Sequence, residues 1–223
     1  MKRDELEIMS FRDIFQGRDQ QLEENAINKL SKIVNKQSVS ILQEVVSTTT
    51  ADTKILAASA LIDMEDKITK RVEVLLATLK EEPDNYEVRL ELGRAYDLYC
   101  HLGVRDTVVK SYYQKLAVEQ YQLFLRKRPG HPDATFEYGR VLLSQGQTDQ
   151  AIHVFQEATE LAPKDPGPQV WLAEAYYEKE DYSTVYKICN HLYQKRAIPA
   201  HLKDVVEWWS VAKNPTQPAA MHA

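Results

Sequence analysis

Apolar residues recur along this chain at spacings of three and four, with polar residues between them, and this periodicity predicts amphipathic helices. Two such segments in the N-terminal third are QLEENAINKLSKIV (21–34) and DTKILAASALIDME (52–65), and a shorter helix is predicted between them in SVSILQEVVS (38–47). Glycine is scarce, at 7 residues, while good helix formers abound. Strand-rich folds need many turn residues, so we predict an all-α fold of helices joined by short connections.

The C-terminal half repeats a helical hairpin. In DATFEYGRVLLSQGQTDQAIHVFQEATELAPKD, small Gly139 and Ala151 would let two helices approach closely, and Pro163 would end the second helix. Thirty-four residues later the matching positions are Ala173 for Gly139, Val185 for Ala151, Cys189 for Phe155 and Leu192 for Ala158. A period of about 34 residues with this pattern resembles the tetratricopeptide repeat (TPR), a helical hairpin that stacks on its neighbours.

The preceding unit is lengthened. Gly139 lies 46 residues after Gly93, which is 12 more than one repeat, and the extra residues fall before Ala117. Two longer helices with a turn near residues 103–106 would accommodate them, and Asp106 is a plausible N-cap for the second helix. Residues 70–83, KRVEVLLATLKEEP, read as the closing helix of a further, degenerate unit.

The N-terminal segments resemble the helical pairs of HEAT repeats, because the apolar positions of the two helices match: Ala26, Ile27, Leu30 and Ile33 with Ala57, Ala58, Leu61 and Met64. These resemblances imply a right-handed α-solenoid of helical hairpins. We predict four segments along the chain: a HEAT-like or degenerate helical-hairpin region over 1–83, TPR units over 84–199 (84–130 lengthened, 131–165 and 166–199), a capping helix over 200–213 and a disordered tail over 214–223.

Composition narrows the range of possible functions. The chain has 223 residues, a net charge of −5 and a pI near 5.7, without the excess of Lys and Arg that nucleic-acid binding usually needs. The sequence has no apolar run long enough to span a bilayer and no signal-peptide core, so we expect a soluble, cytoplasmic chain. Cys100 and Cys189 lie in helical apolar patterns, which is typical of buried, reduced thiols.

No catalytic signature is recognisable. The sequence lacks a P-loop, a dinucleotide fingerprint, a nucleophile elbow, HExxH and paired CxxC motifs. Carboxylate pairs lie near helix ends or in polar stretches, where solvation and the helix dipole explain them. We therefore predict no enzymatic activity, no cofactor and no metal, and expect other proteins to be the partners. An α-solenoid enzyme would need a groove with convergent carboxylates, which the sequence does not show.

The first candidate binding surface is the groove lined by the first helix of each TPR unit. Three positions per unit would face it: three before, one after and four after the small residue. These are Leu90, Arg94, Asp97, Phe136, Arg140, Leu143, Val170, Glu174 and Tyr177. The set mixes apolar anchors with both signs of charge, as a peptide site would. Asparagine is absent from it, which disfavours the clamp that some TPR domains use for C-terminal carboxylates. The alternative is a merely solvated surface.

The second candidate surface is the tip of the lengthened hairpin. Its apolar residues lie beyond the usual length of a TPR unit: Val104, Val108, Val109, Tyr112 and Tyr113. Such a patch would serve as a docking or self-association surface. Alternatively, it packs against the N-terminal helices or its own partner helix.

The order of features resembles a narrower family. FRDIFQGRDQQLEENAINKL, then AASALIDMEDKI, then LGRAYDLYCHLGVRDTVVKSYYQKLAVEQY, followed by regular TPR units, is similar to the soluble region of PelE, the TPR-containing inner-membrane subunits of the Pel exopolysaccharide secretion machinery. The resemblance implies a scaffold at the cytoplasmic face of the inner membrane, tethered by transmembrane helices absent here. Its partners would include a cyclic-di-GMP receptor. A general cytoplasmic TPR adaptor unrelated to polysaccharide export is the alternative.

Overall fold

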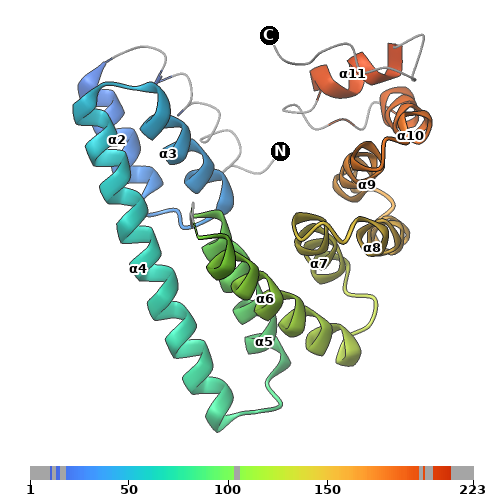
Figure 1. Cartoon of the computed structure of the whole chain (residues 1–223), viewed down its shortest axis with the longest axis horizontal. Helices are drawn as coiled ribbons and strands as arrows, with labels where there is room; N and C mark the ends of the chain where they lie inside the picture. Colours follow the sequence, from blue (N-terminus) through green and yellow to red (C-terminus); the bar gives the residue numbers. More distant parts are fainter. Residues whose placement is uncertain are drawn as a thin grey trace. The chain divides into compact units, whose positions relative to one another are not determined.

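A computed structural model describes residues 11, 14–15, 19–102, 106–195, 198 and 203–211. Every regular element within these ranges is an α-helix, which confirms the predicted all-α class (Figure 1). The chain divides into two compact units, Met1–Gln120 and Tyr121–Ala223. The predicted tail over 214–223 lies outside the described residues, as do the ends of the predicted capping helix. None of the helices in the described ranges is both long enough and apolar enough to cross a lipid bilayer.

The first unit opens with three helices, α2 (Gln20–Leu30), α3 (Lys36–Thr48) and α4 (Ala51–Glu81). Side chains start two of them: Asp19 accepts a hydrogen bond from the amide of Leu22, and Asn35 accepts one from the amide of Ser38. The three helices contact one another (Figure 1). The segments predicted from apolar periodicity therefore form a packed helical group.

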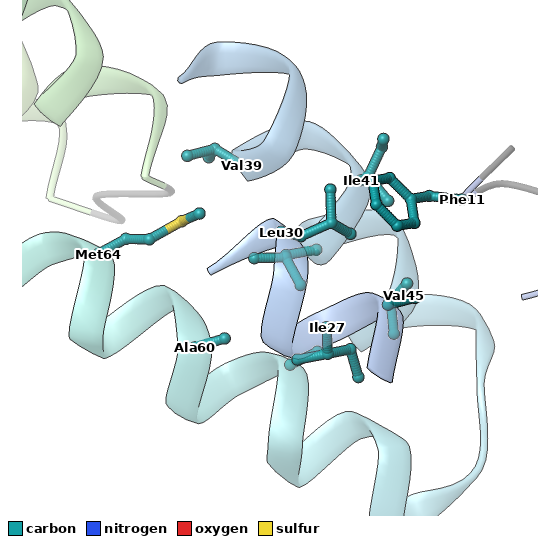
Figure 2. Close-up of a cluster of buried hydrophobic side chains, with 11 residues drawn as sticks. Phe11, Ile27, Leu30, Val39, Ile41, Val45, Ala60 and Met64 are labelled. Carbon is teal, nitrogen blue, oxygen red and sulfur yellow. The ribbon is translucent and has the colours of Figure 1, made fainter. Parts of the chain in front are cut away.

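An apolar core joins these three helices (Figure 2). Ile27 and Leu30 of α2 are fully buried, as is Met64 of α4, and Phe11 adds an aromatic ring. A buried hydrogen bond of 2.7 Å, donated by Thr53 Oγ1 to Glu23 Oε2, ties α4 to α2. Most of the residues matched between the two HEAT-like segments thus lie in this core. The assignment of these helices to the HEAT repeat family stays a prediction.

Helix α4 differs from the sequence expectation. Residues 52–65 and 70–83 were expected to belong to different hairpin units, yet α4 runs without interruption for 31 residues. The stretch that joins them contains no glycine or proline, so nothing stops the helix there. Its C-terminal half instead accompanies α5 (Tyr86–His101), with Glu65 accepting a 3.0 Å hydrogen bond from the hydroxyl of Tyr99.

The lengthened hairpin consists of α5 and α6 (Thr107–Lys127). Asp106 caps α6 as predicted, because its carboxylate accepts hydrogen bonds from the amides of Val108 (2.8 Å) and Val109 (3.2 Å). Tyr113 of α6 packs on Tyr96 and Tyr99 of α5, with ring centroids 5.7 and 4.4 Å apart. The turn predicted near 103–106 lies mostly outside the described residues.

In the second unit, the regular hairpins follow the predicted register. They are formed by α7 (Pro132–Ser144) with α8 (Thr148–Leu161), and α9 (Gly167–Glu178) with α10 (Tyr182–Gln194). A Cβ atom placed on Gly139 would lie 2.7 Å from Cε1 of Phe155, so only a glycine admits this close crossing. Gly146, with φ of 72°, makes the turn between α7 and α8.

The last helix described is α11 (Lys203–Val211), which packs on α10. Val206 and Trp209 are buried in a cluster with Ala173, Val185, Cys189 and Leu192. Four of these residues are the repeat positions expected from the sequence. Helix α11 therefore packs on the last hairpin, and its role as a capping helix over 200–213 stays a prediction.

Candidate protein-binding surfaces

The nine residues predicted to line a groove fall into three levels of exposure. Leu90, Asp97 and Leu143 are buried; Arg94, Phe136, Arg140 and Val170 are half-buried; Glu174 and Tyr177 are exposed. The first three positions belong to the first unit and the other six to the second. We therefore describe the two helix faces separately.

In the first unit, neighbouring helices cover the predicted face of α5. Asp97, expected in an open groove, is buried because Lys36 of α3 forms an ion pair with its carboxylate and His101 Nδ1 lies 3.6 Å from Oδ1. Arg94 is also occupied, since its Nη1 donates a 2.9 Å hydrogen bond to Glu91. Leu90 and Asp97 therefore offer a partner almost no surface, contrary to the expectation. In the second unit, Leu143 is likewise buried in α7.

In the second unit, aromatic rings line the first helices of the two hairpins. Phe155 of α8 is fully buried beneath Gly139, and its ring centroid lies 6.1 Å from that of Phe136 and 6.3 Å from that of Trp171. Phe155 thus packs against the next hairpin. Phe136 and Trp171 are only half-buried, so this aromatic row continues from the core to the surface.

Arg140 lies on this row. Its guanidinium carbon is 4.7 Å from the ring centroid of Trp171 and 5.9 Å from that of Phe136. Both distances fall within the range of cation–π attraction. Phe136 and Arg140 were predicted groove residues, and the structure brings them together with Trp171, which the sequence analysis had not placed in the groove.

Three further predicted residues share one side of α9, since Val170, Glu174 and Tyr177 are spaced by four and three. Desolvation raises the pKa of Glu174, and the carboxylate of Glu178 raises it further. Tyr177 contacts Tyr182 and Trp209, with ring centroids 5.7 and 5.9 Å away, while 39% of the residue stays exposed. We define the α7–α9 face as Phe136, Arg140, Val170, Trp171, Glu174 and Tyr177.

The hairpin tip separates into two sides. Val108 and Tyr112 are 75% and 59% exposed, whereas Tyr113 packs on α5 and is half-buried, as is Val109. Val108 and Tyr112 border a shallow depression of about 370 Å³, which Thr107, Ser111 and Lys115 also line. One side of α6 thus packs on its partner helix, as the alternative expected, and the other side is exposed; its docking role stays a prediction. Val104 lies outside the described residues.

The sequence analysis missed an exposed apolar series on α4. Ile55 and Ile62 are 70% and 62% exposed, and Val74 and Leu76 are exposed as well. Ile55, Ile62 and Leu76 are separated by multiples of seven residues, a spacing that keeps them near one side of a helix. That spacing was the available signal, but apolar residues in a helix are more often core residues.

The titratable groups of the described residues include two buried cysteines. Within the described ranges, no three His, Cys, Asp or Glu side chains are grouped as metal ligands would be. Cys100 and Cys189 are free, as expected, and buried. Burial raises the pKa of Cys100 to about 12 and that of Cys189 to about 11, which keeps both thiols protonated near neutral pH.

Comparison with known proteins identifies the repeat. The model of the TPR repeat family matches residues 139–179, which include the C-terminal part of α7, all of α8 and all of α9. No curated protein matches the chain. The matched range includes every residue of the α7–α9 face except Phe136.

Solved structures of MamA are similar to this chain. MamA from Desulfovibrio magneticus RS-1, from residue 41 to its end, is 17% identical, with a TM-score of 0.50 and coverage of 87% of this chain and 98% of that chain. MamA of MSR-1 is 20% identical, with a TM-score of 0.47 and coverage of 85% and 98%. MamA of AMB-1 is also 20% identical, with a TM-score of 0.45 and coverage of 84% and 96%.

These comparisons confirm the predicted fold class, an α-solenoid of helical hairpins. Over residues 139–179 the chain matches the TPR repeat family. Stacked helical repeats present extended surfaces to other proteins.

Proposed function

We propose that this chain is a non-catalytic scaffold that binds a partner protein through the α7–α9 face. The observation that carries this proposal is the row of half-buried aromatic rings with Arg140 stacked on it. Aromatic residues and arginine dominate the energetics of protein interfaces, because they combine large contact area with polar groups. Exposed Tyr177 extends the same face along α9.

A second contact is proposed at the outer side of α6. Val108 and Tyr112 border the depression there, and neither is needed to hold α6 on α5, since Tyr113 supplies that contact. An exposed valine and tyrosine on one side of a helix provide the small apolar area typical of a secondary docking point. Arg94, which was predicted to line the groove, adds a positive charge at the surface of the first unit.

We further propose that the complex is a Pel-type exopolysaccharide synthesis and secretion complex at the cytoplasmic face of the inner membrane. The support is the order of features along the chain, from the N-terminal helices through the lengthened hairpin to the regular TPR units. The partners would be membrane components of that machinery, including a cyclic-di-GMP receptor. The alternative is a general cytoplasmic TPR adaptor or assembly factor, which the same face would serve.

An affinity capture tests both the proposed binding face and the proposed Pel-type complex. The chain is used as bait in detergent-solubilised membranes of its source bacterium, beside Tyr177→Ala and, as a matched tyrosine control in the first unit, Tyr86→Ala. We expect polysaccharide synthase or cyclic-di-GMP receptor subunits on the wild type and the control, and at least about tenfold less on Tyr177→Ala. Retention of chaperones or unrelated soluble proteins alone would favour the adaptor. Equal retention by all three baits would contradict the assignment of the face.

A further inference from the structure

Arg140 is a half-buried cation without an ionic partner among the described residues. No carboxylate there lies within ion-pairing distance of its guanidinium, and its contacts are the rings of Trp171 and Phe136. Its Nε atom has almost no solvent contact and no hydrogen-bond partner. A ligand cannot reach this buried Nε atom, but the rings that contact the guanidinium do not neutralise its charge. An unneutralised cation at a half-buried position favours an anionic partner at its other N–H groups.

The other half-buried arginines in the described residues are satisfied. Arg94 donates to Glu91 at 2.9 Å, and Arg89 donates to the carbonyl oxygen of Pro83 at 2.8 Å. Arg140 occupies the repeat position of Arg94, one residue after the glycine, and Glu137 occupies the repeat position of Glu91. Glu137 nevertheless forms no ion pair with Arg140, and its carboxylate Oε2 accepts a hydrogen bond from the hydroxyl of Tyr121 at 3.5 Å.

We propose that Arg140 is the receptor for an acidic side chain of the partner, which lies as a peptide segment across Phe136 and Trp171. This inference rests on the proposed function and specifies the partner's chemistry. A guanidinium presents a planar fork of N–H donors that matches a carboxylate, and the two rings hold that fork in place before binding. Shielding by the rings and the incoming peptide would strengthen the pair relative to one in open water.

The acidic residues elsewhere on the α7–α9 face limit where the partner segment can carry a carboxylate. Glu174 and Glu178 lie on α9, and the elevated pKa of Glu174 reflects a carboxylate already opposed by desolvation and by its acidic neighbour. A second partner carboxylate near α9 would be repelled. The structure therefore favours a segment with one acidic residue at Arg140 and neutral or basic residues over Glu174.

A peptide selection tests this inference. Random ten-residue segments are displayed internally, so that no terminal carboxylate is available, and selected against the full wild-type chain. Binding of recovered peptides is then measured to wild type, Arg140→Gln, Arg140→Lys and Arg126→Gln. Arg126 is an exposed arginine in the last turn of α6, outside the α7–α9 face, so its replacement makes the same charge change elsewhere. Thermal unfolding of every variant checks that each is folded.

The inference predicts recovered peptides that share one Asp or Glu. Changing that residue to its amide should weaken binding to wild type and to Arg126→Gln by about tenfold or more, but binding to Arg140→Gln by less than about twofold. Arg140→Lys should recover only part of the loss, because an ammonium lacks the planar fork.

Two results would overturn it in distinguishable ways. Peptides that need no acid, yet lose binding in Tyr177→Ala, would refute the role of Arg140 and leave the α7–α9 face as the binding surface. If no recovered peptide depends on Arg140 or on Tyr177 for binding, both the inference and the proposed function are contradicted.

Discussion

Arg94 and Arg140 each follow the glycine of a TPR-like helix, Gly93 and Gly139, but their surroundings differ. Arg94 pairs with Glu91, and Glu91 also pairs with Arg71 of α4. Arg140 meets only aromatic rings among the described residues. The same repeat position thus stabilises the fold in the first unit and is left for a ligand in the second.

The difference originates in the helices that pack against α5 and against α7. In the first unit, α3 and α4 both contact α5, and Lys36 neutralises Asp97 from α3. In the second unit, α7 contacts α8 and α9, the successive elements of regular hairpins, and these leave Phe136, Arg140 and Trp171 half-exposed. The predicted face of α5 in the lengthened unit is therefore enclosed by other helices, whereas the corresponding face of the regular units stays partly exposed.

The largest expected effect concerns the crossing of α7 and α8, on which the α7–α9 face depends. Gly139→Leu should destabilise the second unit by about 3 kcal/mol, because even a Cβ atom there would lie 2.7 Å from Phe155. Denaturant unfolding measures the change. Gly146→Ala is the control: its φ of 72° is unfavourable for alanine but no atom lies within 4 Å, so about 1 kcal/mol is expected. An unchanged midpoint for Gly139→Leu would refute the repeat register.

Adjacent tyrosines on α6 provide the second contrast. Tyr113→Ser should lower stability by about 2 kcal/mol, because its ring packs on Tyr96 and Tyr99. Tyr112→Ser should change stability by no more than about 0.5 kcal/mol, since 59% of Tyr112 is exposed. Thermal unfolding measures both. Equal losses would show that the tip has no free side.

A smaller effect is expected from removing the ammonium group of Lys36, which pairs with Asp97 of α5. Lys36→Met leaves the buried carboxylate of Asp97 without its lysine, and partial exposure of Lys36 limits the expected loss to about 1 kcal/mol. Urea unfolding measures this loss, and Lys32→Met is the control, since Lys32 is exposed nearby. A stable Lys36→Met variant that gained binding of the selected peptides at α5 would show that the two faces are equivalent, against our account.

Thiol reactivity compares the units without disturbing either. Because the pKa values of Cys100 and Cys189 are raised to about 12 and about 11, both thiols are protonated at pH 8 and the native chain should react slowly with an aromatic disulfide reagent. Reaction should become fast in denaturant. Single Cys100→Ala and Cys189→Ala variants report each unit separately. Fast reaction of one native thiol would mean that its unit opens readily.

Much of the fold follows from sequence, because the decisive constraints are local or periodic. Gly139 and Ala151 fix the hairpin, and Asp106 caps α6 through amides two and three residues away. The continuity of α4 was missed because a pattern of apolar residues does not show where a hairpin turns when no breaker is present. The absence of Gly and Pro in the joining stretch was the usable signal.

The surface was harder to predict for a physical reason. Whether a helix face is open depends on contacts between residues distant in sequence, such as Lys36 with Asp97. Repeat position alone therefore placed Asp97 and Leu90 in a groove that other helices fill. Counting repeat positions did select Arg140 and Phe136, but the stacking of Arg140 on Trp171 required the packing of α7 beside α9.

The most direct test of the central claim is site-specific photocrosslinking in living cells. Tyr177 on the α7–α9 face, Tyr112 on α6 and exposed Lys187 on α10 are each replaced by p-benzoylphenylalanine in otherwise wild-type protein. The account predicts a discrete crosslinked partner from position 177, a weaker product from position 112 and none from position 187. Crosslinks from position 187 alone, or the same product from all three positions, would contradict the claim that the second unit binds its partner through the α7–α9 face.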